Sequence, residues 1–127
     1  MSVVRRTDAR RTETPNAVMT TFASPTQGGS GLAMWRVDMN SDAQGPLHVF
    51  DAEQVWTLLS GTVTVELGDE VLNVEAGDTV ILPAGVPRRL TGGSDAGFAA
   101  VVAAPGGARV SRIGGPEEEA FVPGWIA

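Results

Sequence analysis

Apolar residues in this chain occur in short runs that are separated by turns rich in glycine and proline. The run Thr62–Leu67 alternates between polar and apolar side chains, which is the pattern of a strand with one buried face. Gly68-Asp69 then forms a two-residue hairpin turn into Glu70–Val74, where glycine adopts a positive φ at low steric cost. Between residues 17 and 110, no segment has the apolar spacing of an amphipathic helix. The pattern predicts an all-β chain.

The same pattern predicts further strands on both sides of this hairpin. The full predicted set is Ala17–Ala23, Leu32–Met39, Pro46–Phe50, Gln54–Leu59, Thr62–Leu67, Glu70–Val74, Thr79–Leu82, Arg88–Thr91 and Gly97–Ala104. Many short strands with closely spaced turns are typical of a sandwich or a barrel, because an open sheet of this kind would expose its edges. A barrel of this size can hold one small ligand among its inward side chains.

The ends of the chain differ from its middle. We expect residues 1–14, which are polar and lack apolar periodicity, to be a disordered or loosely ordered arm. Residues 15–112 are predicted to form one barrel domain, the usual outcome for a chain of 127 residues. Residues 113–127 are predicted to be a tail. Its apolar end, from Phe121 to Ile126, is expected to dock on the barrel or on a dimer partner.

Composition excludes several classes of function. The chain has no Cys and no Lys, so thiolate chemistry and a Schiff base have no side chain to use. The net charge is −6, which argues against a nucleic-acid partner. No apolar run has the length of a signal peptide or a membrane span, so we expect a cytoplasmic protein without a membrane partner.

Two stretches resemble the sequence motifs of the cupin superfamily. Residues His48–Gly61 resemble the first motif, which reads His-x-His, three or four residues, Glu, six residues and Gly. Residues Gly77–Arg88 resemble the second, in which Gly is followed after five residues by Pro-x-Gly, two residues and His. The resemblance implies a single all-β jelly-roll barrel of the RmlC-like, double-stranded β-helix type. It leaves the activity open, since cupins include oxygenases, isomerases, epimerases, decarboxylases, cyclases, sugar-binding modules and storage proteins.

The ligand positions of these motifs are depleted in this chain. In the family, two His and a Glu from the first motif and one His from the second bind Fe, Mn, Ni, Cu or Zn. Here His48 fills the first His position, but Phe50, Gln54 and Arg88 fill the others. We therefore expect no metal cofactor. The alternative is one divalent metal held by His48 and Gln54 and completed by a nearby carboxylate or water.

His48 and Arg88 are the candidate catalytic residues. His48 is the only His in the chain, and its ordinary pKa of about 6.5 suits a general acid or base. The planar guanidinium group of Arg88 suits an anionic ligand or a developing enolate oxygen. The alternatives are that His48 is a buried polar group without chemistry and that Arg88 pairs with an acidic side chain at the barrel mouth.

The predicted ligand pocket has an aromatic lining. Trp56 shares a strand face with Gln54, and Phe50 belongs to the same motif. Met34 and Arg36 share one face of the strand Leu32–Met39, and the interpretation assigns this face to the pocket. Plain core packing is the alternative for Phe50 and Trp56.

The favoured function is that of a small-molecule-binding cupin with metal-independent isomerase, cyclase or dehydratase chemistry. One alternative is a metal-dependent cupin, such as an oxygenase of the quercetin-dioxygenase type. Another is a ligand-binding or sensory cupin without catalysis. The expected partners are a small molecule, for which Arg88 favours an anionic group, and a second copy of the chain in a homodimer, with Ala17–Ala23 and Trp125-Ile126 as candidate interfaces.

Overall fold

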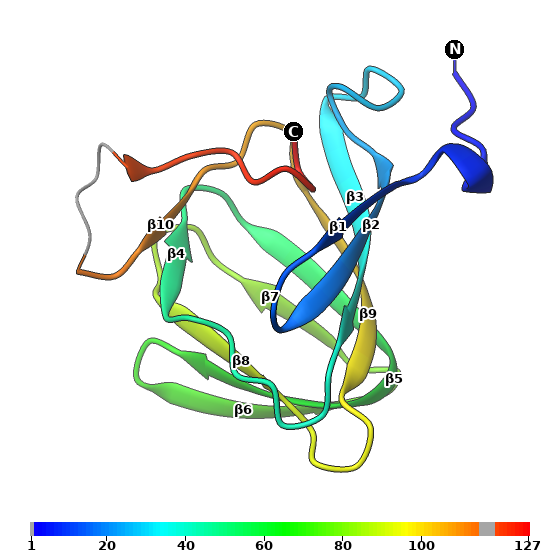
Figure 1. Ribbon diagram of the computed structural model, residues 1–127. Coiled ribbons are helices and arrows are strands. Elements are labelled where there is room, and N and C mark those ends of the chain that lie inside the picture. Colours follow the sequence, from blue (N-terminus) through cyan, green and yellow to red (C-terminus); the bar gives the residue numbers. More distant parts are fainter. Residues whose placement is uncertain (1, 115–118) are drawn as a thin grey trace.

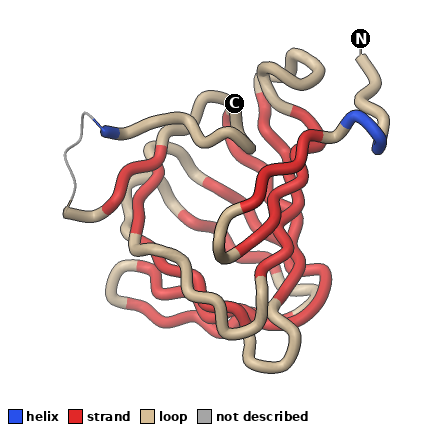
Figure 2. Tube along the Cα trace, viewed as in Figure 1, coloured by secondary structure: helices blue, strands red, loops and turns tan. Residues whose placement is uncertain are grey.

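The computed structural model of the chain describes residues 2–114 and 119–127, which form an antiparallel β-barrel (Figure 1). One turn of 3-10 helix, η1 (Arg6–Asp8), precedes the strands. The described residues form ten strands, which are β1 (Arg10–Glu13), β2 (Ala17–Ala23), β3 (Leu32–Met39), β4 (His48–Phe50), β5 (Gln54–Leu67), β6 (Glu70–Glu75), β7 (Thr79–Leu82), β8 (Arg88–Gly92), β9 (Phe98–Pro105) and β10 (Val110–Arg112). Strands and loops account for most of the trace (Figure 2). The predicted all-β class is confirmed.

The barrel has two walls that share strand β5. One wall runs from β1 through β2, β3 and β9 to the first half of β5. Strand β7 pairs with the other edge of that half. The other wall contains the second half of β5 with β6, β8, β4 and β10. Strand β5 therefore connects the two walls, with Gln54 at the start of its first half.

Strand β5 changes walls at Gly61. The sequence predicted two strands with a turn at Ser60-Gly61, but the chain continues as one strand whose pairing with β9 shifts register between Leu58 and Ser60. Gly61 has a φ of 74°, and a Cβ atom placed there would lie 2.0 Å from the carbonyl oxygen of Gly97. Only glycine can therefore occupy this bend without displacing the facing backbone.

The apolar side chains of both walls meet in one core. On β3 the buried positions alternate with exposed ones, which is the period of a strand with one inner face. The buried apolar residues that form the core cluster are Ala17, Met19, Ala33, Trp35, Val37, Met39, Phe50, Trp56, Leu58, Val63, Val65, Val74, Leu82, Leu90, Phe98, Ala100, Val102, Ala104, Ala108 and Ile126. The presence of Ile126 in this cluster shows that the C-terminal tail is part of the barrel interior.

The tail links β10, at one end of the strand order, to β2, which lies next to the other end. Phe121 exchanges two backbone hydrogen bonds with Val110 of β10, at 2.9 and 3.1 Å. Farther along, the Thr21 hydroxyl of β2 donates to the carbonyl oxygen of Trp125 at 2.6 Å. In Figure 1 the red C-terminal segment crosses one end of the barrel between these strands. The tail therefore closes the gap between β10 and β2.

The carbonyl oxygen of Ala127 is held by three side chains. Ser24 and Thr26 each donate a hydroxyl hydrogen bond of 2.6 Å to it, and the Arg10 guanidinium donates at 2.8 Å. Arg10 belongs to β1, which lies within the segment for which the sequence suggested a loosely ordered arm. The strand is polar and pairs with β2 through its backbone, so it has no apolar alternation that could predict it.

The described residues contain no helix of the length and apolar character that a membrane span requires.

Candidate functional site

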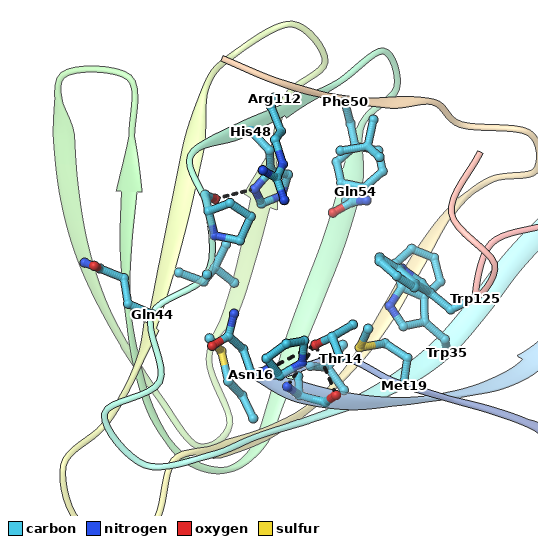
Figure 3. Close-up of a pocket in the computed structure, with 18 of the residues that line it drawn as sticks. Thr14, Asn16, Met19, Trp35, Gln44, His48, Phe50, Gln54, Arg112 and Trp125 are labelled. Carbon is cyan, nitrogen blue, oxygen red and sulfur yellow. Dashed lines mark hydrogen bonds between the residues drawn. The ribbon is translucent and has the colours of Figure 1, made fainter. Parts of the chain in front are cut away.

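A cavity of about 750 Å³ opens at the end of the barrel where the tail crosses (Figure 3). Its lining is mainly apolar, from Pro15, Ala17, Met19, Trp35, Val37, Met39, Pro46, Phe50, Trp56, Leu90, Phe98, Val110, Phe121 and Trp125. The polar side chains of the lining are Thr14, Asn16, Gln44, His48, Gln54, Ser111, Arg112 and Glu119. A cavity of this size and character suits a small molecule that has a large apolar body and few polar groups.

His48 of β4 contributes the only imidazole of the chain to the cavity lining. Its Nδ1 atom lies 2.7 Å from the carbonyl oxygen of Pro46, which can only accept a hydrogen bond. Nδ1 therefore carries the proton in the neutral ring, and Nε2 carries the lone pair. Burial lowers the pKa of His48 below 6.5, the repulsion from Arg88 adds to this effect, and the hydrogen bond to Pro46 opposes it. At neutral pH, Nε2 is a proton acceptor.

Gln54 lies on the cavity wall, and its amide oxygen and amide nitrogen have different surroundings. Its Oε1 atom accepts a hydrogen bond of 3.0 Å from the indole Nε1 of Trp56, which is a donor only, so the amide orientation is fixed. The Nε2 atom of Gln54 is buried and has no hydrogen-bond partner among the described residues. A buried donor without a partner is unfavourable, and a ligand oxygen in the cavity would satisfy it.

Aromatic side chains cover much of the cavity wall. All three tryptophans of the chain, Trp35, Trp56 and Trp125, belong to the lining. The ring centroids of Trp56 and Phe98 are 6.2 Å apart, and Phe50 meets the His48 ring edge-on at 5.6 Å. Such a wall favours a flat, aromatic ligand.

Arg88 of β8 points into the barrel but does not line the cavity. Its side chain is fully buried, and it donates hydrogen bonds to the carbonyl oxygens of Pro83 at 2.6 Å and Val86 at 3.1 Å. The guanidinium carbon lies 5.8 Å from the centre of the Phe50 ring, and it is Phe50 that reaches the cavity. Burial lowers the pKa of Arg88 to about 10. Arg88 is therefore separated from the cavity by Phe50, and only its charge can reach a ligand there.

Met34 and Arg36 lie outside the cavity, which corrects the interpretation of strand β3. The inner face of β3 carries Trp35 and Val37, and Met34 is 40% exposed on the opposite face. Arg36 forms a bidentate ion pair with Asp38, with N–O distances of 2.9 and 3.0 Å. Alternation along the strand groups the residues correctly, but it does not say which group faces inward. The cavity is continuous with the apolar core, so the apolar face is the inner one.

The residues at the motif positions do not fit a metal ion. Phe50 has no donor atom, and Arg88 is a cation, so only one imidazole and one amide remain. Asp51 is turned to the backbone N–H of Arg109, at 2.8 Å, and no group of three His, Cys, Asp or Glu side chains in the described ranges is arranged to hold a metal. The alternative set thus consists of His48 and Gln54, and Asp51, one of the carboxylates near it in the sequence, is engaged by the backbone.

Sequence reasoning missed Arg112 and the tail residues of the cavity. Arg112 of β10 pairs across the sheet with His48, and Trp125 and Phe121 enter from the tail. These segments are short or irregular, and they carry no alternation that marks an inner face. The one relevant signal in the sequence was the apolar end of the tail, which predicted docking on the barrel or on a partner.

Comparisons with known proteins identify the family. A family model for the cupin domain matches residues 35–104, more than half of the chain. A search of curated proteins finds no match. The polyketide cyclase RemF from Streptomyces resistomycificus superposes with a TM-score of 0.75 at 21% identity, covering 92% of this chain and 88% of that one.

Two further solved structures share the fold at lower identity. An RmlC-like cupin from Shewanella frigidimarina superposes with a TM-score of 0.68 at 13% identity, covering 83% of this chain and 90% of that one. Oxalate decarboxylase from Bacillus subtilis, described with Mn(II) centres, gives 0.70 at 16% identity and covers 91% of this chain and 30% of its own. The jelly-roll fold expected from the motifs is confirmed, and this chain belongs to the cupin family.

Proposed function

We propose that this cupin binds a flat, aromatic small molecule in its cavity and catalyses a metal-independent proton transfer of the isomerase, cyclase or dehydratase type. The observation that carries the proposal is His48, a mainly neutral imidazole on an apolar cavity wall whose Nε2 atom has no hydrogen-bond partner among the described residues. A general base works best when its pKa is near the working pH and its surroundings exclude water.

The proposed reaction begins at a carbon atom next to a ligand carbonyl. His48 Nε2 removes a proton from this carbon, the electron pair forms a carbon–carbon double bond, and the carbonyl oxygen becomes an enolate. Gln54 Nε2, which lacks a partner in the described part of the chain, donates a hydrogen bond to that oxygen. In a ligand that has a carbon–carbon double bond one carbon farther from the carbonyl, the enolate is conjugated with it; the imidazolium then returns the proton to the far carbon of that bond, the double bond moves next to the carbonyl, and the ligand is isomerised.

A cyclase variant of the reaction needs the same groups. The enolate carbon attacks a second carbonyl of the same molecule, and the imidazolium protonates the resulting alkoxide. Neither route needs a further reactant, because every bond formed uses electrons from the ligand. The likeness to a polyketide cyclase supports this variant among the three.

Arg88 is proposed to stabilise the enolate at a distance. Its buried charge lies behind the Phe50 ring, and its Nη1 atom has no partner among the described residues. A fixed positive charge near a low-dielectric cavity favours negative charge that develops there. In this proposal Arg88 supports the reaction, and His48 and Gln54 contact the ligand.

The test uses 2-acetylnaphthalene, a neutral aromatic ketone with exchangeable hydrogens next to its carbonyl. Binding is followed by the quenching of tryptophan fluorescence, since all three tryptophans line the cavity. Proton transfer is followed in D2O as the loss of the methyl signal by proton NMR. We expect His48→Gln to slow the exchange by about 100-fold or more while binding is retained.

The matched control is Arg36→Gln, because Arg36 lies outside the cavity. Equal exchange rates in the wild type and His48→Gln would refute the catalytic role of His48. Binding without any exchange above the buffer rate would favour a ligand-binding cupin that lacks catalysis.

A further inference from the structure

Three basic side chains lie in a row across the second wall of the barrel. Arg112 of β10 is the cross-strand partner of His48 of β4, and His48 is in turn the partner of Arg88 of β8. Directly paired residues of neighbouring strands point to the same face of a sheet. Figure 3 shows the side chains of Arg112 and His48 together at one side of the cavity.

No acidic side chain neutralises this row within the described ranges. The ion pairs among the described residues are Arg11–Glu13, Arg36–Asp38 and Arg89–Glu66, all away from the row. Glu119 also lines the cavity, but it is exposed and lies beyond ion-pair distance of every described arginine. Among the described residues, the β4–β10 edge of the cavity therefore carries the charge of Arg112 without an ion-pair partner.

The two arginines of the row differ in what they can reach. The guanidinium group of Arg88 is occupied by the carbonyl oxygens of Pro83 and Val86. Arg112 lines the cavity, is exposed, and forms no ion pair with a described residue. Its planar group can bind both oxygens of a carboxylate at once, which a single ammonium group cannot do.

We propose that Arg112, with His48 beside it, binds the carboxylate of an aromatic acid at the edge of the cavity, so that the preferred ligands are aromatic carboxylates. The inference rests on the proposed function, because it takes the same cavity as the ligand site. The acid group then lies at the β4–β10 edge, and the ring system extends towards the tryptophans. A carboxylate beside His48 also stabilises the protonated ring and makes Nε2 a stronger base.

The test compares 2-naphthoate with 2-naphthamide, which have the same ring system and differ in charge. Isothermal titration calorimetry at pH 7 gives both affinities for the wild type, Arg112→Gln and Arg89→Gln. We expect the wild type to bind 2-naphthoate about tenfold more tightly or better. In Arg112→Gln the two affinities are expected to agree within about twofold, with that for 2-naphthamide unchanged. Arg89→Gln removes the same charge from the outer face and is expected to keep the preference.

Each outcome separates this inference from the proposed function. Equal affinities in the wild type, or a loss in Arg112→Gln that is the same for both compounds, would overturn the carboxylate site and leave aromatic binding intact. If neither compound binds, the cavity does not take aromatic ligands, and both proposals fail. If the acid is preferred but His48→Gln leaves proton exchange unchanged, the carboxylate site stands and the catalytic role of His48 fails.

Discussion

The tail that closes the barrel can be tested through Ile126. Its side chain is fully buried in the core cluster, next in the chain to Trp125 of the cavity wall. We predict that Ile126→Ala lowers the free energy of unfolding. If the tail were loosely attached in solution, the same change would have little effect, so the substitution measures docking directly.

The expected size follows from burial. Truncation to alanine removes three carbon atoms at about 0.8 kcal/mol each, about 2.4 kcal/mol in all before any cavity is counted. The unfilled cavity raises the loss to about 3 kcal/mol, within the range of about 2–5 kcal/mol for such truncations. If the variant tail detaches from the barrel, the loss in the free energy of unfolding cannot exceed the free energy with which the tail docks. That docking free energy includes the hydrogen bonds to Trp125 and Ala127.

Urea unfolding followed by circular dichroism is the assay. With an m-value of about 2 kcal/mol per M, the midpoint is expected to fall by roughly 1.5 M. The control is Ile113→Ala, where the same side chain is 45% exposed just after β10 and outside the cavity lining, and a loss below about 1 kcal/mol is expected. If the Ile126→Ala midpoint falls no further than that of the control, the docked tail is not the structure in solution.

Four further predictions follow from the site and the outer surface. First, stability is expected to fall as the pH drops below about 6.5, because burial lowers the pKa of His48 and the folded chain then binds fewer protons than the unfolded chain. Thermal melts should show this fall in the wild type and not in His48→Gln. If the melting temperature of His48→Gln falls equally over this pH range, the lowered pKa of His48 is not its cause. Second, Arg88→Met is expected to raise the free energy of unfolding by about 1 kcal/mol. Burial lowers the pKa of Arg88 to about 10, which corresponds to a cost of about 3 kcal/mol, and the lost hydrogen bonds offset about 2 kcal/mol. A fall in the free energy of unfolding, measured in urea, would show that the hydrogen bonds dominate. Third, elemental analysis of protein purified without chelators is expected to give metal well below one equivalent per chain. Added Zn²⁺ or Mn²⁺ is expected to leave the melting temperature unchanged. Near-stoichiometric metal would overturn the conclusion that these residues do not fit a metal ion. Fourth, the apolar row Met34–Ala103–Val55–Ile81 on the outer face predicts a homodimer by light scattering, and a mass of 13.2 kDa would refute it.

Most strands were predictable because the pattern that indicates a strand lies within a few neighbouring residues. The strand Leu32–Met39 and the hairpin at Gly68-Asp69 were predicted as they occur, since alternation and turn chemistry depend on neighbouring residues only. The break predicted at Ser60-Gly61 is instead a bend within β5, because local sequence cannot say whether a glycine ends a strand or turns it.

The site was less predictable because it depends on which face turns inward. His48 and Gln54 reach the cavity as the motif spacing suggested, whereas Arg88 is enclosed behind Phe50 by its bonds to the turn at residues 83–86. Arg112 could not be found at all. Its place beside His48 arises from pairing between strands that are far apart in the sequence.

The shared strand β5 has a consequence for how this cavity can change. Gln54 and Trp56 sit on a strand whose neighbours include β7 and β9 in one wall and β6 and β8 in the other. A substitution that moves this strand disturbs both walls at once, so this side of the cavity resists reshaping. Phe121 and Trp125 stand on the tail, outside the shared strand. New ligand preferences, whether by natural divergence or by directed evolution, should therefore arise more readily from substitutions in the tail than from substitutions in β5.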